Sequence, residues 1–291
     1  MTLPRALARS LADLIGGEVQ RAHAVGGGSI NDAWRVEAPA GTLFVKSRPD
    51  ATAEDFAMEA AGLRWLRAGG AAAPAVIAHG ASPAFLALEW IEPGRLSAAG
   101  AEELGRSLAA LHRTGAETFG ALPPGAPDSI LRLGSVEVEL SPADGWVEAY
   151  AGQLVLPLAR RAVDAGRLTS HEARVIEAAC GRLADTGTPT EPPARLHGDL
   201  WSGNVLAGAS GSAWLIDPAA YGGHREVDLA MLDLFGAPSP RILSAYAEEF
   251  PLADGYRDRA PLWQVLPLLV HAILFGGGYG ASAARAAVSS T

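Results

Sequence analysis

The sequence predicts an α+β fold of two lobes, a small β-rich N-terminal lobe over residues 1–92 and a mainly helical C-terminal lobe over residues 93–291. Three observations support this prediction. Short apolar runs separated by turn residues fill most of the first lobe. Pro93-Gly94 then interrupts the chain, and the segments that follow have helical apolar spacing. With 291 residues, of which 49% are apolar, the chain is long enough to bury a substantial core.

The N-terminal lobe is expected to contain five strands and two helices. A helix lies within the first 20 residues, with apolar positions at Leu7, Leu11, Leu14 and Ile15. Strands are expected at 19–25, 33–37, 43–46, 75–78 and 84–91. A second helix over 53–68 is inserted after the third strand, because Phe56, Ala60, Leu63 and Leu66 recur at helical spacing.

The C-terminal lobe is expected to be helical apart from one short β element. The predicted helices cover 96–112, 146–165, 170–183 and most of the chain from 227 onward. The β element comprises residues 195–196, 205–206 and 214–216. Residues 123–127 and 186–193 are expected to be loops.

Composition excludes several classes of protein. A formal net charge of −9 makes a basic nucleic-acid-binding face a poor prospect. The best membrane-spanning candidate, residues 265–284, contains a histidine and four glycines, so we expect a buried core helix that ends at Gly276-Gly277-Gly278. The single cysteine, Cys180, allows no intrachain disulfide, and no secretory signal is visible. A cytoplasmic protein is therefore expected.

A glycine-rich loop and a lone lysine point to phosphate binding. Gly26-Gly27-Gly28-Ser29 lies between two expected strands, where glycines would let backbone N–H groups approach phosphates. Of the 23 basic residues only Lys46 is a lysine, and it ends the third strand. A kinase needs a cation at such a place, fixed by a carboxylate from the following helix, where Glu59 lies. A plain hairpin turn and two surface side chains are the alternatives.

The strongest signal is the stretch His-Gly-Asp-Leu-Trp-Ser-Gly-Asn at 197–204. Asp199 and Asn204 have the spacing of a kinase catalytic loop, in which the aspartate accepts the substrate hydroxyl proton and the asparagine binds Mg²⁺. Asp217 follows a short hairpin, where a second metal-binding carboxylate belongs. A polar loop with an Asx turn is the alternative. Together with Lys46 these residues predict an ATP-dependent, Mg²⁺-using kinase with a protein-kinase-like bilobal fold.

Three further residues are candidates for the site. Glu89 ends the last N-terminal strand, where the hinge between the lobes should lie and where backbone groups would bind adenine. Trp201 is either a core anchor or a surface on which a sugar ring stacks. His197 either orients Asp199 or simply fills space, and the structural role is the one expected.

The chain resembles the fructosamine kinase (ketosamine-3-kinase) family over nearly its whole length. The His-Gly-Asp triplet alone would indicate only the wider aminoglycoside phosphotransferase-like group, whereas its extension to Asn204 is a narrower signal. The other matching segments are Gly-Gly-Gly-Ser-Ile-Asn (26–31), Phe-Val-Lys (44–46), Ile-Asp-Pro-Ala (216–219), Gly-His-Arg-Glu-Val-Asp-Leu-Ala-Met (223–231) and the stretch 268–279.

The resemblance implies ATP, Mg²⁺ and phosphorylation of the sugar 3-hydroxyl of a ketosamine, free or protein-bound, formed by glycation of an amine. The product would be unstable and release the amine, which amounts to repair. By position, the resemblance makes Asp199 the base, gives Asn204 and Asp217 to Mg²⁺, and gives the phosphates to Lys46 with Glu59. It also implies that Asp228 braces the catalytic loop and that His224 and Arg225 lie near the substrate.

Two other functions remain open. Another small-molecule kinase of the same scaffold would act on an aminoglycoside, choline or a sugar. A pseudokinase-like binding protein is the alternative of a different class, although it would not need Lys46, Asp199, Asn204 and Asp217 together. The sequence leaves the preferred ketosamine and the oligomeric state open.

Overall fold

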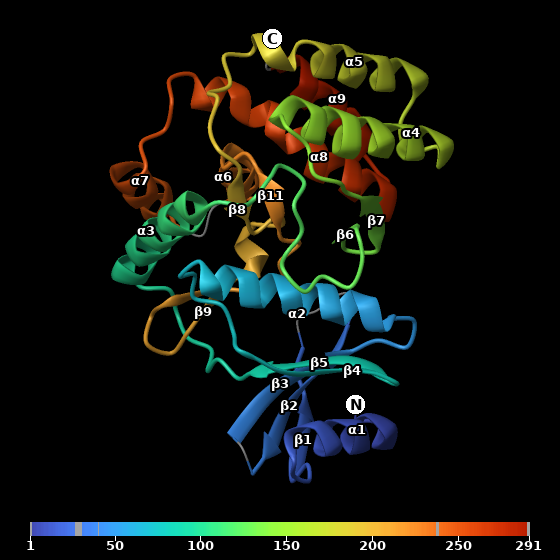
Figure 1. The fold of residues 1–291 in the computed structure, drawn as a ribbon, viewed down its shortest axis with the longest axis vertical. Coiled ribbons are helices and arrows are strands. Elements are labelled where there is room, and N and C mark those ends of the chain that lie inside the picture. Colours follow the sequence, from blue (N-terminus) through green and yellow to red (C-terminus); the bar gives the residue numbers. More distant parts are fainter. Residues whose placement is uncertain (1, 27–30, 40, 237–238, 290–291) are drawn as a thin grey trace.

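The computed structural model describes residues 2–26, 31–39, 41–236 and 239–289. It has the two-lobed α+β arrangement that the sequence predicts. The N-terminal sheet lies at one end of the molecule, and the C-terminal helices occupy the other end (Figure 1). The predicted boundary after residue 92 falls in the segment that connects the last strand of the sheet to the next helix.

The N-terminal lobe is a five-stranded antiparallel sheet in the order β1-β2-β3-β5-β4, with one helix on each face. This confirms the predicted five strands and inserted helix. The elements are α1 (Arg5–Ile15), β1 (Arg21–Ala24), β2 (Asp32–Ala38), β3 (Gly41–Ser47), α2 (Ala53–Ala68), β4 (Val76–Ala81) and β5 (Ala84–Glu89).

Successive side chains of β3 point to opposite faces of the sheet and enter two different apolar layers. Leu43 and Val45 are buried in the cluster under α1, whereas Phe44 packs against the cluster that includes α2. Since successive side chains of a strand point to opposite faces, Lys46 lies on the α2 side with Phe44. Its placement inside the molecule is therefore dictated by the register of one strand.

Helix α2 begins at a capping box and lies between the sheet and the C-terminal lobe (Figure 1). The Thr52 hydroxyl accepts the Asp55 N–H while the Asp55 carboxylate accepts the Thr52 N–H, which fixes the first turn. The predicted range of this helix matches its observed bounds. Its buried face puts Glu59 one turn from both Phe56 and Leu63, so the carboxylate points inward.

The C-terminal lobe surrounds a second apolar core built mainly from helices. Its helices are α3 (Ala98–Thr114), η1 (Glu148–Val155), α4 (Leu156–Asp164), α5 (Ser170–Gly181), η2 (Leu183–Asp185), η3 (Ser202–Asn204), α6 (Glu226–Leu234), α7 (Pro240–Glu249), α8 (Tyr256–Phe275) and α9 (Tyr279–Ser289). Its strands are β6 (Ile130–Leu133), β7 (Val136–Glu139), β8 (Ala194–Leu196), β9 (Val205–Ala207), β10 (Ala213–Leu215) and β11 (Tyr221–Gly223).

The structure differs from the expected C-terminal lobe in three places. A hairpin of β6 and β7 forms where no strand was expected. The β element is two separate ladders, because β8 pairs with β11 while β9 pairs with β10. The single helix expected over 146–165 is a π-helix, η1, followed by α4. Apolar spacing over so few residues does not distinguish these forms.

The apolar segment near the C-terminus is part of the core, as predicted. Helix α8 ends at Phe275, where Gly276 closes it with a φ of 70°. In the part of the chain that the structure describes, no helix combines the length and apolarity that crossing a membrane requires.

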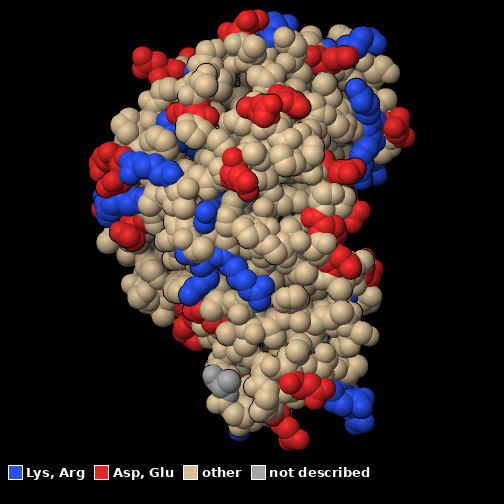
Figure 2. Space-filling model, in the orientation of Figure 1, with Lys and Arg blue, Asp and Glu red and all other residues tan. Residues whose placement is uncertain are grey.

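Charged side chains are interspersed over the face in Figure 2, with uncharged residues between them. Acidic and basic groups alternate there and do not form one large field. Long-range attraction of a charged macromolecule to this face is therefore not favoured.

The packing of α3 against α7 depends on a glycine. A Cβ added at Gly105 would lie 2.2 Å from the backbone oxygen of Ile242. We expect Gly105→Ala to destabilise the protein by about 1–3 kcal/mol, because the two backbones must separate. The measurement is the free energy of unfolding in denaturant.

Gly181→Ala, in α5, is the matched control, because a Cβ there meets nothing within 4 Å. It should be neutral or add up to about 1 kcal/mol of stability. Equal losses for the two variants would contradict the close contact.

Candidate functional site

The expected catalytic loop follows β8 and turns sharply at Gly198. This residue has a φ of 81°, and a Cβ there would lie 1.9 Å from the backbone oxygen of Ala219. Any other residue would thus meet both conformational strain and a clash. The glycine of the His-Gly-Asp triplet is required because the loop passes directly over the backbone of the segment that follows Asp217.

A fully buried carboxylate holds the start of this loop. Asp228 accepts the backbone N–H of His197 at 2.7 Å and that of Gly198 at 2.9 Å. Its Oδ2 also lies 3.2 Å from Nε2 of His112, which comes from α3. Burial alone would raise the pKa of Asp228, but the contact with His112, the nearby His197 ring and the Gly198 N–H outweigh it and lower the pKa. The expected place of Asp228 as the brace of the loop is confirmed.

His197 connects the loop to the segment that carries Asp217. Its Nε2–H donates to the Ile216 carbonyl at 3.0 Å, and its Nδ1 accepts the Asp199 N–H at 3.3 Å. The ring is completely buried, and burial lowers its pKa. A neutral imidazole with a proton on Nε2 satisfies both contacts, which supports the expected structural role.

Asp199 and Asn204 face each other across the loop. The Asn204 amide donates to the Asp199 Oδ2 at 2.9 Å and to the Asp199 carbonyl at 2.8 Å. Burial raises the pKa of Asp199 to about 6, although the Asn204 hydrogen bond opposes this shift. The carboxylate is thus ionised at neutral pH, yet its proton affinity is closer to neutrality than that of an ordinary aspartate.

Lys46 joins the two lobes through a pair of carboxylates. Its Nζ lies 2.7 Å from Oε2 of Glu59 on α2 and also contacts Oδ1 of Asp217. The lysine is only 4% exposed. Asp217 has a φ of 51° and is the one non-glycine residue with positive φ in the described part of the chain. The predicted pairing of Lys46 with Glu59 is confirmed, and the structure adds Asp217 to it.

Glu59 and Asp217 both contact the Lys46 ammonium, but the pKa values of the two carboxylates shift in opposite directions. Burial raises the pKa of Glu59 to about 7, and its Oε1 has no hydrogen-bond partner within the described residues. Burial would also raise the pKa of Asp217, but Lys46 outweighs that effect and lowers it. Burial disfavours a charged lysine, yet the two acids raise the pKa of Lys46 and keep it protonated.

The donor set fits a magnesium ion held together with phosphates. Asp217 offers a carboxylate, and Asn204 offers its side-chain oxygen because its nitrogen is used on Asp199. The described residues contain no group of three or more carboxylate, histidine or cysteine ligands. Mg²⁺ is usually bound by one or two carboxylates plus substrate phosphates, and Asp217 supplies a carboxylate of this kind.

Trp201 stands at the mouth of the loop and is 38% exposed. Its ring lies over Gly203, where an added Cβ would fall 2.3 Å from the ring. Its edge meets Phe235, with centroids 6.1 Å apart. Trp201 is therefore not a core anchor, and part of its ring is open to solvent.

The predicted roles of Glu89 and of the glycine-rich loop are not tested by the structure. The N–H of Glu89 donates to the Ala75 carbonyl, and its side chain accepts the Ala75 N–H at 2.8 Å, so these groups serve the sheet. Its predicted part in adenine binding through the backbone stays a prediction. Gly27, Gly28 and Ser29 lie outside the described residues, and their predicted contact with phosphates also stays a prediction.

His224 and Arg225 are not brought together with the other candidates. His224 is 1% exposed and stacks on Trp263. Arg225 forms two hydrogen bonds to Glu191, at 2.7 and 2.8 Å, and lies over the Phe250 ring. Their positions give no support to the expected substrate contact, because both side chains are enclosed by partners in the core.

Sequence reasoning missed His112 and its partner Tyr246, whose hydroxyl lies 2.9 Å from Nδ1 of His112. Both are buried and stand behind Asp228. His112 lies on the apolar stripe of a predicted helix. The residues around it do not indicate its partner Asp228, which lies 116 positions further along the chain.

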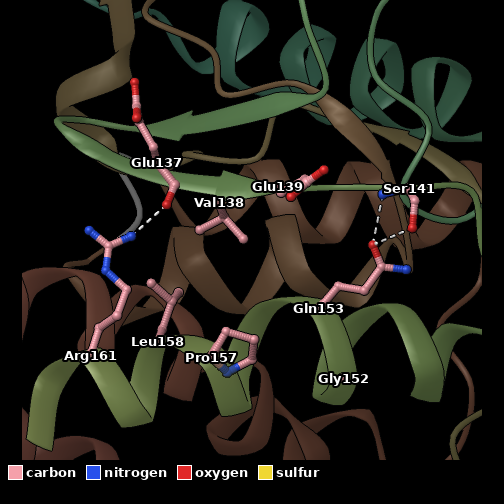
Figure 3. A pocket seen from close by; sticks show the side chains of 9 residues that line it. All are labelled: Glu137, Val138, Glu139, Ser141, Gly152, Gln153, Pro157, Leu158 and Arg161. Carbon is pink, nitrogen blue, oxygen red and sulfur yellow. Dashed lines mark hydrogen bonds between the residues drawn. The ribbon is translucent and has the colours of Figure 1, made fainter.

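A hollow of about 400 Å³ lies between β7 and the helices η1 and α4 (Figure 3). Gln153 and Arg161 line it and bind backbone groups of Ser141 and Glu137. None of its lining residues belongs to the constellation around Asp199. The hollow is therefore separate from the candidate site.

Comparison with known proteins agrees with this geometry. The family model described as fructosamine kinase matches residues 5–289. A Thermus thermophilus protein named probable ketoamine kinase is 36% identical over 253 residues, 87% of each chain. A crystal structure from Thermobifida fusca, provisionally assigned as a fructosamine-3-kinase, has 41% identity and a TM-score of 0.89 over 99% of both chains. The choline kinase LicA of Streptococcus pneumoniae shares the fold alone, with 14% identity and a TM-score of 0.63 over 98% of this chain and 96% of its own.

Lys46 should not tolerate arginine, although the chain uses arginine at every other basic position. A compact ammonium fits between Glu59 and Asp217, whereas a planar guanidinium is larger and spreads its charge. We expect Lys46→Arg to lower kcat/KM for the nucleotide about 10²-fold, a loss that misplacement by about 1 Å can cause. Steady-state kinetics on the folded variant provide the measurement.

Lys46→Met is the companion variant, since it removes the charge at similar volume. Both variants should be impaired to a comparable degree. An arginine variant with near-normal kcat and nucleotide KM would show that the site needs only a positive charge.

Proposed function

Because the chain belongs to the fructosamine kinase family, we propose that it transfers the γ-phosphoryl group of ATP to the 3-hydroxyl of a ketosamine. The acceptors in view are ribulosamine, erythrulosamine and fructosamine adducts of amines or of protein lysines. Phosphorylation makes such an adduct unstable and releases the amine, so the role is deglycation repair. Kinase activity is the property of the family, while the donor, the hydroxyl and the acceptor are our proposal.

One observation carries the proposal, namely the constellation of Asp199, Asn204, Asp217 and Lys46 around one point between the lobes. Phosphoryl transfer depends on positioning and charge neutralisation, and each of these residues supplies one part. A binding protein would need no such combination. LicA, which has the same fold, has been solved with AMP bound.

In this proposal Asp199 orients the acceptor hydroxyl and takes its proton. Its Oδ2 is occupied by the Asn204 amide, so Oδ1 remains for the hydroxyl. The hydroxyl oxygen forms a bond to the γ-phosphorus while the bond to the β-phosphate oxygen breaks, and ADP leaves. The proton passes to Asp199 and then to solvent. A pKa near 6 suits this transfer, because the carboxylate is ionised beforehand and accepts the proton readily.

Lys46 binds the phosphates of the donor and keeps its contact with Glu59. Asn204 and Asp217 would hold Mg²⁺, which would neutralise charge on the phosphates. Asp217, which contacts Lys46 in this structure, would supply a carboxylate oxygen to that cation. The raised pKa of Lys46 ensures that the ammonium is charged throughout.

The exposed indole of Trp201 favours a ketosamine over a simple polar alcohol. Its face can pack against the apolar side of a sugar and attract a secondary ammonium, worth about 0.5–2 kcal/mol depending on desolvation. A ketosamine offers both groups in one molecule. Choline offers only the cation, and ribose offers only the sugar.

The test is an acceptor panel under one set of conditions with ATP and Mg²⁺. It compares a ribulosamine and a fructosamine with their unglycated amines, ribose, choline and kanamycin. We expect kcat/KM to be highest for a ketosamine, with phosphate on its 3-hydroxyl by NMR. A higher value for choline or kanamycin would overturn the proposed substrate and leave the kinase chemistry intact.

Two variants show whether the named residues do this chemistry. Asp199→Asn should reduce kcat for every acceptor by about 10²–10⁴-fold with little change in ATP affinity. Trp201→Ala should raise the ketosamine KM and leave the ATP KM unchanged. Asp50→Asn, at an aspartate whose side chain is 85% exposed, is the control and should behave as wild type. Less than a tenfold loss in Asp199→Asn would remove Asp199 from the role of base.

A further inference from the structure

Both ends of α2, the helix that carries Glu59, are bound by arginines of the C-terminal lobe. Arg132 of β6 contacts the first turn, and Arg195 of β8 contacts the last. We propose that these two arginines are positioning residues, which fix α2 from the C-terminal lobe and thereby set Glu59 against Lys46.

The contact at the start of α2 is a partly buried ion pair in which one arginine binds two carboxylates. Nε of Arg132 donates to Oδ1 of Asp55 at 2.9 Å, while its two terminal nitrogens bind both carboxylate oxygens of Asp128 at 2.7 and 3.0 Å. The Arg132 side chain is 11% exposed. Such a bidentate guanidinium has a defined orientation, so it can hold a helix in a defined place. Arg132 is itself rooted in the C-terminal core, because its neighbours Leu131 and Leu133 are buried there.

The contact at the end of α2 uses the backbone and a ring. Nη1 of Arg195 donates at 2.8 Å to the Trp65 carbonyl in the last turn of the helix, and this carbonyl also accepts the Gly69 N–H at 3.1 Å. The guanidinium also lies 4.7 Å from the centroid of the Trp65 ring. Its Nε donates to the Gly115 carbonyl at 3.3 Å, behind α3. A cation at a helix C-terminus is favourable as well as directional.

Glu59 lies between these two points on a rod of 16 residues, about 24 Å long. Between the ends, Phe56, Leu63 and Leu66 share one apolar cluster with Leu104 and Leu108 of α3. A helix pinned at both ends and packed along its middle cannot swing away from Lys46 without breaking these contacts. The site therefore keeps its Lys46–Glu59 pair without a modification or a partner to push α2 inward.

The chain offers a matched control in Arg48, which follows β3 in the N-terminal lobe. Its Nη2 donates to Oδ2 of the same Asp55 at 2.7 Å, so it contacts the same carboxylate without joining the lobes. Arg132→Gln removes the connection between the lobes at the start of α2, and Arg48→Gln removes only a contact within the N-terminal lobe. The proposal requires the two substitutions to differ.

The proposal rests on the proposed use of ATP, so the first measurement needs no donor. Amide hydrogen exchange of residues 53–68 should quicken in Arg132→Gln and remain as in wild type in Arg48→Gln. ATP affinity should then fall about 3- to 30-fold in Arg132→Gln and less than about twofold in Arg48→Gln. If the wild type bound no ATP, the proposed function would fail while the exchange result still decided the anchoring.

A double-mutant cycle separates positioning from general loss of stability. In a Glu59→Gln background, Arg132→Gln should change ATP affinity less than about twofold, because its effect passes through Glu59. An unchanged penalty in that background would overturn the proposal, as would equal effects of Arg48→Gln and Arg132→Gln or unaltered exchange of α2. Should Arg132→Gln fail to fold, Arg132→Lys keeps the charge but loses the bidentate guanidinium. It must then show faster exchange of residues 53–68 and weaker ATP binding, with smaller changes in both.

Discussion

The carboxylate of Asp228 is the interaction on which the rest of the site depends. It is buried completely, a position that is costly for a charge unless hydrogen bonds compensate it. Here the compensation comes from the loop that it organises, because the N–H groups of His197 and Gly198 both point at it. The same contacts that keep Asp228 ionised therefore fix the direction in which Asp199 leaves the loop. His112 completes the arrangement from α3 and is held in turn by Tyr246 of α7.

Most charged side chains near Asp228 form hydrogen bonds that hold parts of the protein together. Glu226, two residues earlier, is equally buried and binds Arg259 and Trp263 of α8, which ties α6 to the C-terminal core. Arg225 serves the loop at Glu191 and the end of α7 in the same way. The charged residues 225, 226 and 228 thus hold the elements around the site in place. Within the described residues, the side chains that we propose for ligand contact are Asp199, Asn204, Asp217, Lys46 and the exposed ring of Trp201.

Much of this could be predicted where the physical cause is local. The bounds of α2 followed from its apolar spacing, and Asp199 and Asn204 lie in one loop whose spacing is itself the signal. The sequence does not reveal partners that lie far apart along the chain. The family resemblance places His224 and Arg225 near the substrate, which stays a prediction, and only the structure shows that they pack against Trp263 and Glu191. The His112–Asp228 contact spans 116 residues, and the β6–β7 hairpin rests on alternation over four-residue strands. The glycine-rich loop at 27–29 lies outside the described residues, so its part in the site stays a prediction.

The central claim is that Asp228 acts on chemistry through the catalytic loop and not only on stability. Asp228→Asn and Glu226→Gln provide the direct test, because both remove a fully buried charge from the same helix and each should destabilise the fold by several kcal/mol, about 3–5 for a broken buried pair. The measurement is kcat at saturating substrates on folded protein, with ATP affinity measured in parallel. We expect Asp228→Asn to lose at least about 10²-fold in kcat, because a catalytic group is misplaced, with ATP affinity nearly unchanged. Glu226→Gln should keep kcat within a few-fold of wild type. Equal values of kcat for the two variants would contradict the central claim.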